Sequence, residues 1–195
     1  MIAMIDYDAG NIKRVEKALL LLGHEVEVTG DPERILKAEK VILPGRRGIW
    51  RCMENLKRAG LDEVIRQVAA KRTPFLGICL GLQLLFERSD EAPGAEGLGL
   101  LEGEILKIPD QEGLKIPHMG WNSLHLEHGG RLFRGIEEQS YVYFVHSYYL
   151  HADDREDVSA TTEYGVSIDA ARTERKSLCG TVPIRKKVVK LGFKC

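Results

Sequence analysis

Apolar and polar residues in the first half of the chain follow a pattern typical of alternating strands and helices. Short apolar runs predict strands at residues 2–7, 25–30, 40–45 and 74–79. Apolar residues at helical spacing predict helices at residues 12–22, 53–57 and 61–71, and Asp31-Pro32-Glu33 predicts the start of another. Because strands that alternate with helices form parallel sheets covered on both faces, we expect an α/β fold with a mostly parallel central sheet.

The pattern changes after Gly94, where strand-like runs follow one another without helical spacing between them. Residues 102–109, 122–128, 141–150 and 157–164 predict strands separated by glycine, aspartate and proline turns. These strands predict an antiparallel extension in the second half. No repeat or linker interrupts the chain, so we expect residues 1–195 to form a single domain.

The overall charge narrows the choice of partners. Lysine and arginine number 28 and aspartate and glutamate 29, so the net charge gives no reason to expect nucleic acid or an anionic membrane as partner. Apolar runs are shorter than a membrane span and the N-terminus lacks a targeting pattern, so we expect a cytoplasmic protein. The four cysteines lack metal-ligand spacing, so we expect reduced thiols, no metal and no cofactor.

The segment Gly77-Ile78-Cys79-Leu80-Gly81 has the Gly-x-nucleophile-x-Gly pattern between a predicted strand and a helix-like run. A sharp strand-to-helix turn requires small residues on both sides of the nucleophile, which explains both glycines. The thiol then lies at a helix N-terminus, where we expect the thiolate to be favoured and the N–H of Leu80 to face an oxyanion. The alternative is a buried structural cysteine.

Several segments carry a resemblance to a known family. They are "IDYDAGN", "VILPG", "PFLGICLGLQLLFE", "SDEAPGAEGLGLLEG", "PHMGWN", "YFVHSYY" and "TTEYG", and they run from the first predicted strand to about Gly165. In these segments the chain resembles the glutamine amidotransferase subunits of imidazole glycerol phosphate synthase, which are class I, triad-type amidotransferases of histidine biosynthesis. Other class I enzymes share the cysteine elbow, whereas "PHMGWN" with "SDEAPG" indicates this branch.

The resemblance implies a flavodoxin-like fold, hydrolysis of L-glutamine to glutamate and ammonia, and a heterodimer in which ammonia passes to a (β/α)₈-barrel cyclase subunit. It implies that Cys79 is the nucleophile. The expected oxyanion and substrate-binding positions are Leu80, Gly45, Gln83, His146, Ser147 and Tyr148. Met119, Trp121 and Tyr143 fall in stretches expected near the partner.

These assignments have structural alternatives that the sequence leaves open. Met119 and Trp121 could be core residues. His146 could be a hydrogen-bonded core histidine, and Gln83 a solvated helix position, although it lies one helical turn after Cys79 and on the same face.

The chain departs from the family at the base and its orienter. The family has a late "QFHPEKS" motif, whereas this chain has "VPIRKKVV" at residues 182–189, with Ile184 at the histidine position and Lys186 at the glutamate position. Without the base and the carboxylate that orients it, glutamine hydrolysis should be slow. The chain also ends at Cys195 within an expected closing helix, so we expect some C-terminal residues to be missing.

A second departure follows Gly45, where "RRGIWR" at Arg46–Arg51 replaces a small, flexible segment such as "VGAFGD". The simplest interpretation of its arginines is a solvated basic turn. Both unusual blocks keep the family length and have clean edges. One inserted and one deleted nucleotide convert a coding sequence for Gly-Val-Gly-Ala-Phe-Gly-Asp-Cys into one for Gly45–Cys52, so compensated frame slips are our hypothesis for both blocks.

Three functions therefore remain open. The first is a glutaminase subunit that acts through a Cys79 thioester, with the activity of this sequence in doubt. The second is a catalytically dead subunit that binds the cyclase. The third is another cysteine-elbow hydrolase of the same fold that uses His146 or His118 as its base.

Overall fold

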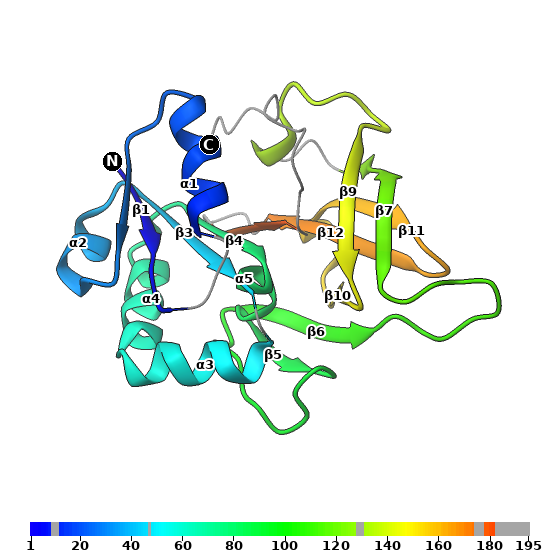
Figure 1. Cartoon of the computed structure of the whole chain (residues 1–195), viewed down its shortest axis with the longest axis horizontal. Coiled ribbons are helices and arrows are strands. Elements are labelled where there is room, and N and C mark those ends of the chain that lie inside the picture. The colour runs from blue at the N-terminus through cyan, green and yellow to red at the C-terminus, as the bar shows by residue number, and fades with distance from the viewer. Residues whose placement is uncertain (9–11, 47, 128–130, 174–177, 182–195) are drawn as a thin grey trace.

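The structure is a computed structural model that describes residues 1–8, 12–46, 48–127, 131–173 and 178–181. Five parallel strands form one half of the main sheet, with β2, β1, β3, β4 and β13 side by side (Figure 1). Four of them come from the first half of the chain, and β13 is the last described strand. The bounds of these strands are β1 Ile2–Ile5, β2 Val26–Thr29, β3 Lys40–Gly45, β4 Phe75–Cys79 and β13 Leu178–Thr181. The predicted α/β fold with a parallel core is confirmed.

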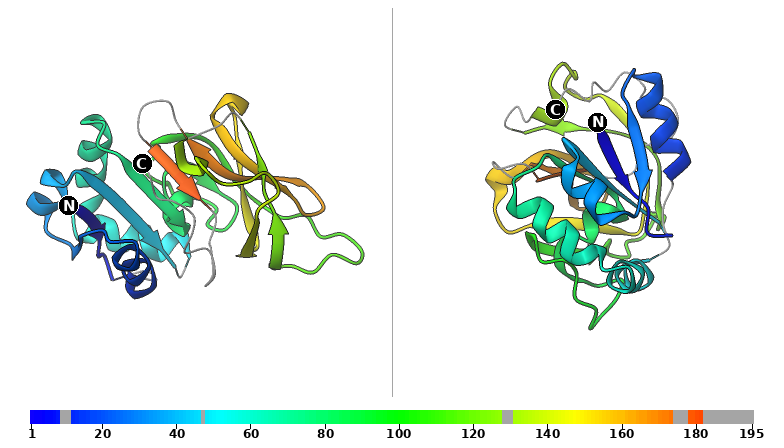
Figure 2. Two further views of the ribbon diagram at one scale, coloured as in Figure 1. Left: turned by 90° about the horizontal axis from the view of Figure 1, so that it is seen from above. Right: turned by 90° about the vertical axis from the view of Figure 1, so that its left-hand side faces the viewer.

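The sheet continues with pairs that are antiparallel except at its last edge, where β5 and β6 are parallel. From β13 the order runs β12, β10, β6 and β5, and β11 pairs with both β12 and β8. These strands are β5 Phe86–Ser89, β6 Leu101–Lys107, β8 His125–Leu126, β10 Tyr148–Ala152, β11 Val158–Glu163 and β12 Ser167–Thr173. A separate antiparallel ribbon is formed by β7 His118–Ser123 and β9 Tyr141–His146, which stands beside the main sheet in Figure 2. The predicted antiparallel extension is therefore present.

Helices cover both faces of the parallel strands, α1 on one side and α3 and α4 on the other (Figure 1). The helices are α1 Ile12–Leu21, α2 Pro32–Lys37, α3 Ile49–Arg58, α4 Leu61–Ala70 and α5 Leu80–Gln83, with 3₁₀ turns at Arg131–Phe133 and Arg155–Asp157. One apolar cluster joins α2, α3, α4 and α5 to the sheet, and a second joins α1 and the β7–β9 ribbon to the opposite face. This two-sided burial explains why the strands are nearly all apolar.

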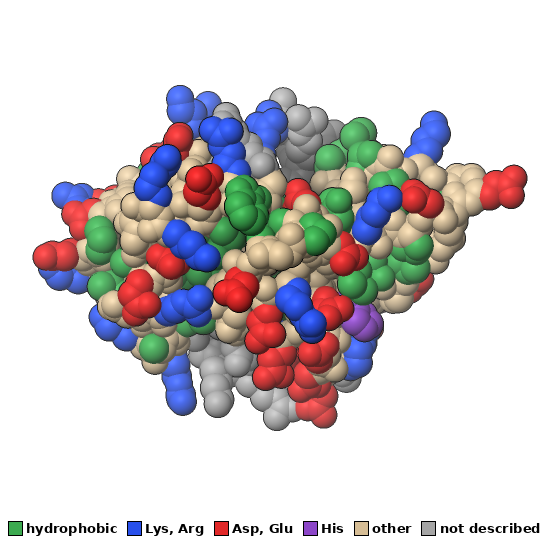
Figure 3. Space-filling view, turned by 90° about the horizontal axis from the view of Figure 1, so that it is seen from below, with side chains coloured by type: hydrophobic (Ala, Val, Ile, Leu, Met, Phe, Trp, Pro, Cys, Tyr) green, Lys and Arg blue, Asp and Glu red, His purple; other side chains and the backbone are tan. Residues whose placement is uncertain are grey.

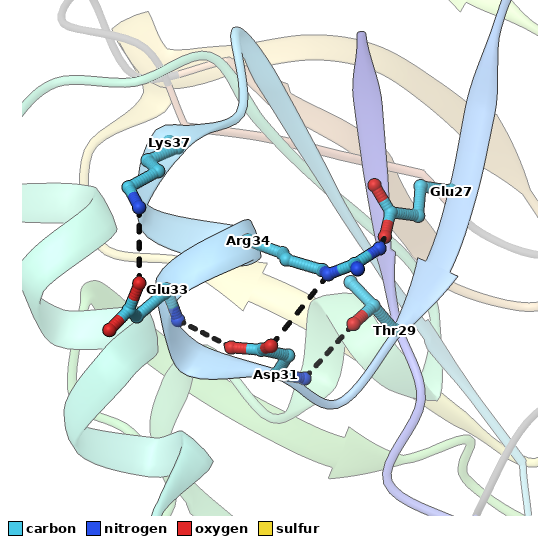
Figure 4. A network of polar contacts seen from close by, with 6 residues as sticks. All are labelled: Glu27, Thr29, Asp31, Glu33, Arg34 and Lys37. Carbon is cyan, nitrogen blue, oxygen red and sulfur yellow. Dashed lines mark hydrogen bonds and ion pairs between the residues drawn. The ribbon is translucent and has the colours of Figure 1, made fainter.

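The predicted cap of α2 is confirmed in atomic detail (Figure 4). The Asp31 carboxylate accepts a hydrogen bond of 2.9 Å from the Glu33 N–H, and Pro32 occupies the first turn. Arg34 bonds to the Glu27 carboxylate on β2, and Lys37 to Glu33 one turn earlier. The cap satisfies a backbone donor that would otherwise lack a partner at the start of the helix.

Three sequence predictions need correction. The apolar run 141–150 is not one strand, because it breaks at Ser147 and continues from β9 into β10, which belongs to the main sheet. The strand predicted at residues 122–128 is divided between β7 and β8. The third correction concerns "RRGIWR", whose last three residues are not a turn but the start of α3, with Ile49 buried in the core.

Charges of both signs share the face seen in Figure 3, with acidic side chains gathered at one edge. This face carries no broad basic patch of the kind that binds nucleic acid. In the described part of the chain, no helix is both long and apolar enough to cross a membrane.

Candidate functional site

Cys79 lies at the turn between β4 and α5, as the sequence predicts. Its backbone angles are φ 58° and ψ −119°, a combination that residues with a side chain rarely adopt. Strand β3 runs parallel to β4 and places Gly45 directly opposite Cys79. The turn therefore presents the cysteine at the carboxyl edge of the parallel sheet, where α/β proteins bind their ligands.

Three glycines make this turn possible because backbone atoms occupy the space of their missing side chains. A Cβ at Gly81 would lie 1.9 Å from the Leu43 carbonyl oxygen, and one at Gly77 would lie 2.7 Å from the Leu82 Cα. A Cβ at Gly45 would lie 2.3 Å from the Gly81 nitrogen. The sequence argument for both elbow glycines is confirmed, and Gly45 is a third position of the same kind.

The thiol itself is not poised as a thiolate. Burial raises the pKa of Cys79 to about 11, although a hydrogen bond from the Leu80 N–H acts in the opposite direction. The Leu80 N–H at the start of the helix thus favours the thiolate as predicted, but burial outweighs it. The helix that follows Cys79 is a single turn of four residues, so its dipole is small beside the cost of burying a charge.

Glu91 belongs to the same neighbourhood and was missed at the level of sequence. Its negative charge contributes to the raised pKa of Cys79, and its carboxylate accepts a hydrogen bond from the Ile49 N–H at the start of α3. Burial raises the pKa of Glu91 as well. The sequence feature that could have indicated Glu91 is the "SDEAPG" segment, which carries two carboxyl side chains a few residues after the helix of the elbow.

Gln83 reaches the segment His146-Ser147-Tyr148, as the sequence predicts for one pocket. Its Nε2 donates to the Tyr148 carbonyl oxygen at 3.3 Å, and its side chain is half-buried. Gln83 is therefore not a fully solvated helix position. The Tyr148 carbonyl oxygen also accepts from His146 Nδ1 at 2.9 Å, so these three residues meet at one backbone atom.

His146 is buried and bonded on both nitrogens. Its Nε2 lies 3.1 Å from Nδ1 of His118, whose ring stacks between Phe144 and Tyr164. Burial lowers the pKa of His118 to about 4 and also lowers that of His146. Both rings are therefore neutral at physiological pH, and the interpretation of His146 as a satisfied buried histidine agrees with the structure.

Of the three residues predicted near the partner, Met119 and Trp121 are exposed rather than part of the core, and Tyr143 is half-buried. Met119 and Trp121 of β7 are 60% and 49% exposed. Strand pairing places Val145 opposite Met119 and Tyr143 opposite Trp121, and the rings of Trp121 and Tyr143 meet edge to face. We call Met119, Trp121, Tyr141, Tyr143 and Val145 the ribbon stripe, because strand alternation places them on one face of the ribbon.

The two unusual blocks differ in how much of them the structure describes. Arg46 and Arg51 are exposed, in agreement with a solvated basic segment. Ile184, Lys186 and the rest of residues 182–195 lie outside the described residues. Strand β13 is parallel to β4 and pairs Thr181 with Ile78, so the last described residue lies beside the elbow.

Among the described residues, no group of three or more histidine, cysteine, aspartate or glutamate side chains has the arrangement of a metal site. The groups that the structure places at the elbow are the Cys79 thiol, the Leu80 N–H that bonds to it and the nearby Glu91 carboxylate.

Comparisons with known proteins identify the family of this chain. Residues 3–181 match the family Glutamine amidotransferase class-I. The imidazole glycerol phosphate synthase subunit HisH of Moorella thermoacetica is 49% identical over 179 residues, which cover 92% of this chain and 84% of that protein. HisH of Bacillus cereus is 49% identical over 168 residues, covering 86% of this chain and 79% of the relative.

Solved structures support the fold independently. The structure of PurLQS from Thermotoga maritima matches 96% of this chain and 90% of its own with a TM-score of 0.71 at 21% identity. A crystal structure of a glutamine amidotransferase matches 93% of this chain and 88% of its own with a TM-score of 0.68 at 15% identity. With the cysteine elbow and the sequence relatives, the conclusion is that this chain belongs to the class I glutamine amidotransferases and, within them, to the HisH family.

Proposed function

We propose that this chain is the glutaminase subunit of an imidazole glycerol phosphate synthase in histidine biosynthesis. In this role it hydrolyses L-glutamine to glutamate and ammonia in the cytoplasm, as a single glutamine amidotransferase domain. The ammonia passes to a cyclase subunit with a (β/α)₈ barrel, which is the other half of a heterodimer. The observation that carries the proposal is Cys79 at a strained elbow in a chain 49% identical to HisH proteins.

The reaction begins with attack of the Cys79 sulfur on the carboxamide carbon of glutamine. The tetrahedral intermediate carries an oxyanion, for which the N–H groups of Leu80 and Gly45 are the candidate donors. Collapse of the intermediate breaks the C–N bond, releases ammonia and leaves a thioester, which water hydrolyses to glutamate. The Glu91 carboxylate is close enough to Cys79 for its charge to raise the pKa of the thiol. It is therefore the candidate partner for the ammonium group of a glutamine bound beside Cys79.

The reaction needs a base, and this is where the sequence raises doubt. A thiol with a pKa of about 11 is ionised in only about one molecule in ten thousand at pH 7. The family histidine would take the thiol proton and return it to ammonia, and Ile184 cannot do either. We therefore expect turnover to be lower by about 10² to 10⁴ than in a relative with the complete triad.

A non-catalytic partner-binding subunit is the second candidate, and a specific observation favours it. The ribbon stripe exposes apolar and aromatic side chains of the kind that form the centres of protein interfaces. Such a surface could bind the cyclase whether or not glutamine is hydrolysed.

The third candidate, a hydrolase with His146 or His118 as base, has no support in the geometry. Both nitrogens of His146 are engaged, one by the Tyr148 carbonyl and one by His118. A His118 pKa of about 4 also leaves little driving force for taking a proton from a buried thiol.

The decisive experiment restores the missing pair. Glutamate release is measured with the cyclase present for the parent chain and for the double variant Ile184→His/Lys186→Glu. We expect the double variant to be faster by about 10² or more, and the further change Cys79→Ala to abolish that gain. Peptide mapping of the purified parent first establishes that it carries "RRGIWR" and "VPIRKK".

Different outcomes separate the candidates. Turnover by the confirmed parent equal to that of complete relatives would contradict the role assigned to the missing base. Binding to the cyclase without turnover, in both the parent chain and the double variant, would favour the partner-binding subunit. Failure to bind the cyclase would rule out both of these roles.

A further inference from the structure

We infer that His118 and His146 are positioning residues for glutamine binding, because they form a hydrogen-bonded relay that fixes the Tyr148 carbonyl and, through it, the Gln83 amide. The inference rests on the proposed function, since it takes Gln83 as a group that contacts glutamine. It adds a role for two buried histidines that the reaction itself does not use.

The protons in the relay can be placed from the acceptor at its end. The Tyr148 carbonyl oxygen can only accept, so His146 Nδ1, which lies 2.9 Å away, must carry a hydrogen. His146 is neutral, and its Nε2 is therefore a lone-pair acceptor. His118 Nδ1, 3.1 Å from that nitrogen, must then be the donor. Each ring is held in the tautomer with its proton on Nδ1.

The relay connects two parts of the molecule that are distant in sequence. It begins at His118 on β7, crosses to His146 on β9, and reaches the Tyr148 carbonyl at the start of β10. There it meets Gln83, whose Nε2 donates to the same oxygen at 3.3 Å, one helical turn after Cys79. The ribbon that carries the exposed stripe is thereby joined to the helix of the elbow.

The position of the relay is fixed by packing as well as by hydrogen bonds. His118 stacks on Phe144 with ring centres 4.8 Å apart and on Tyr164 with ring centres 3.7 Å apart. Its donor therefore has little freedom to turn away from His146. A carbonyl that receives two donors in a fixed geometry holds both of them in place.

The consequence for the substrate lies in the orientation of the Gln83 amide. Because Nε2 of Gln83 donates to the Tyr148 carbonyl, Oε1 is directed elsewhere as an acceptor. Glutamine carries two N–H donor groups, its ammonium and its carboxamide. An amide held with its oxygen available can accept from such a group, whereas a free amide would present oxygen or nitrogen with similar ease.

The first test reads the protons directly in the full chain with its native sequence. Long-range ¹H–¹⁵N spectra distinguish protonated from unprotonated imidazole nitrogens. We expect both His118 and His146 to have a protonated Nδ1 and an unprotonated Nε2. A proton on Nε2 of His146 would overturn the relay, because the Tyr148 carbonyl would then have no donor from that ring.

The second test measures glutamine binding without turnover. Equilibrium dialysis with radiolabelled L-glutamine is done on complexes of the Cys79→Ala chain with the cyclase subunit. In that background His118→Phe keeps a flat ring between Phe144 and Tyr164 but removes the donor, and His118→Asn restores a donor near the position of Nδ1. We expect His118→Phe to weaken binding about fivefold, as for the loss of one hydrogen bond, and His118→Asn to weaken it less.

The control is His125→Phe, which makes the same change at an exposed histidine on β8 bonded to Glu138. We expect it to leave glutamine affinity unchanged. Equal affinity for glutamine in the parent and His118→Phe would overturn the inference while leaving the proposed function intact. Absence of glutamine binding in the Cys79→Ala parent complex would overturn the proposed function and, with it, the role of the two histidines in substrate binding. The spectra would still decide whether the hydrogen-bonded relay exists.

Discussion

The elbow backbone stores strain that a single substitution should release. At φ 58° and ψ −119°, Cys79 lies outside the left-handed helical region as well as the ordinary ones, so any residue with a Cβ is strained there. Cys79→Gly removes the Cβ, whereas Cys79→Ala keeps it. Both variants lose the sulfur, so the difference in their stability excludes the loss of the thiol and contains the backbone strain together with the ordinary cost of glycine.

The expected difference can be worked from its two parts. Strain of this kind costs about 1 to 3 kcal/mol, for which we take about 2. Glycine in place of alanine loses about 1 kcal/mol through the greater entropy of the unfolded chain and the lost methyl contacts. We therefore expect Cys79→Gly to be more stable than Cys79→Ala by about 1 kcal/mol, although neither can form a thioester.

Urea unfolding followed by tryptophan fluorescence measures this difference, provided that the two variants have equal m-values. Ala18→Gly in the interior of α1 is the matched control, since its backbone is helical and the change should cost about 1 kcal/mol. The reasoning is refuted if Cys79→Gly is less stable than Cys79→Ala by the same amount as this control.

Three further predictions test the surroundings of the site. Gly81→Ala, whose Cβ would lie 1.9 Å from a backbone carbonyl oxygen, should lower the free energy of unfolding in urea by more than about 3 kcal/mol. Gly120→Ala, where the space is open, should change it little, and equal effects of the two variants would contradict the packing argument. Asp31→Ala should cost about 1 kcal/mol by the same assay, through loss of the helix cap, and no loss would show the cap to be dispensable. Burial lowers the pKa of both His118 and His146 in the fold, so the unfolded chain binds protons first and stability should fall as pH drops below about 6.5. For His118, whose pKa is about 4, the fall should continue towards pH 4, by up to about 1.4 kcal/mol per pH unit. His118→Phe should flatten that slope in acid titrations of unfolding, and an unchanged slope would rule out His118 as a source.

The sequence was sufficient for the parallel half because local signals and tertiary structure agree there. The run Val41–Gly45 is buried along its whole length, and Asp31 forms the cap that its position predicts. The glycines at the elbow could be predicted because the pattern has one steric explanation. The raised pKa of Cys79 could not be predicted. It comes from burial of the thiol and from charges such as Glu91, which only the fold brings near.

The second half was harder because its strands contain charged residues. Strand β12, which includes Asp169 and Arg172, was not predicted, although both side chains are buried. Each charge has a partner from another segment, Arg155 for Asp169 at 2.5 Å and Asp157 for Arg172 at 2.7 Å. Such pairs make burial of charge tolerable but leave no apolar pattern for sequence analysis to detect.

The break at Ser147 has a similar origin. The apolar pattern continues through residues 141–150, so it predicts one strand. In the fold, His146 instead bonds to the Tyr148 carbonyl two residues ahead, and the chain changes partner from β7 to β6. A hydrogen bond made by a side chain to the backbone nearby competes with the strand ladder, and hydrophobic periodicity does not register it.

The elbow and the missing base are physically separable. The close approaches at Gly45, Gly77 and Gly81 all lie within residues 43–82, where backbone atoms of β3, β4 and α5 fill the space beside these glycines. None of these contacts depends on which side chains stand at positions 184 and 186. We therefore expect substitution there to remove proton transfer while the geometry of the nucleophile is kept, and we expect activity to return when the histidine and glutamate are restored. A repaired chain that remains inactive while folded and bound to the cyclase would favour the partner-binding subunit, and the next position to restore would be Arg46–Arg51, which follows Gly45 directly opposite Cys79.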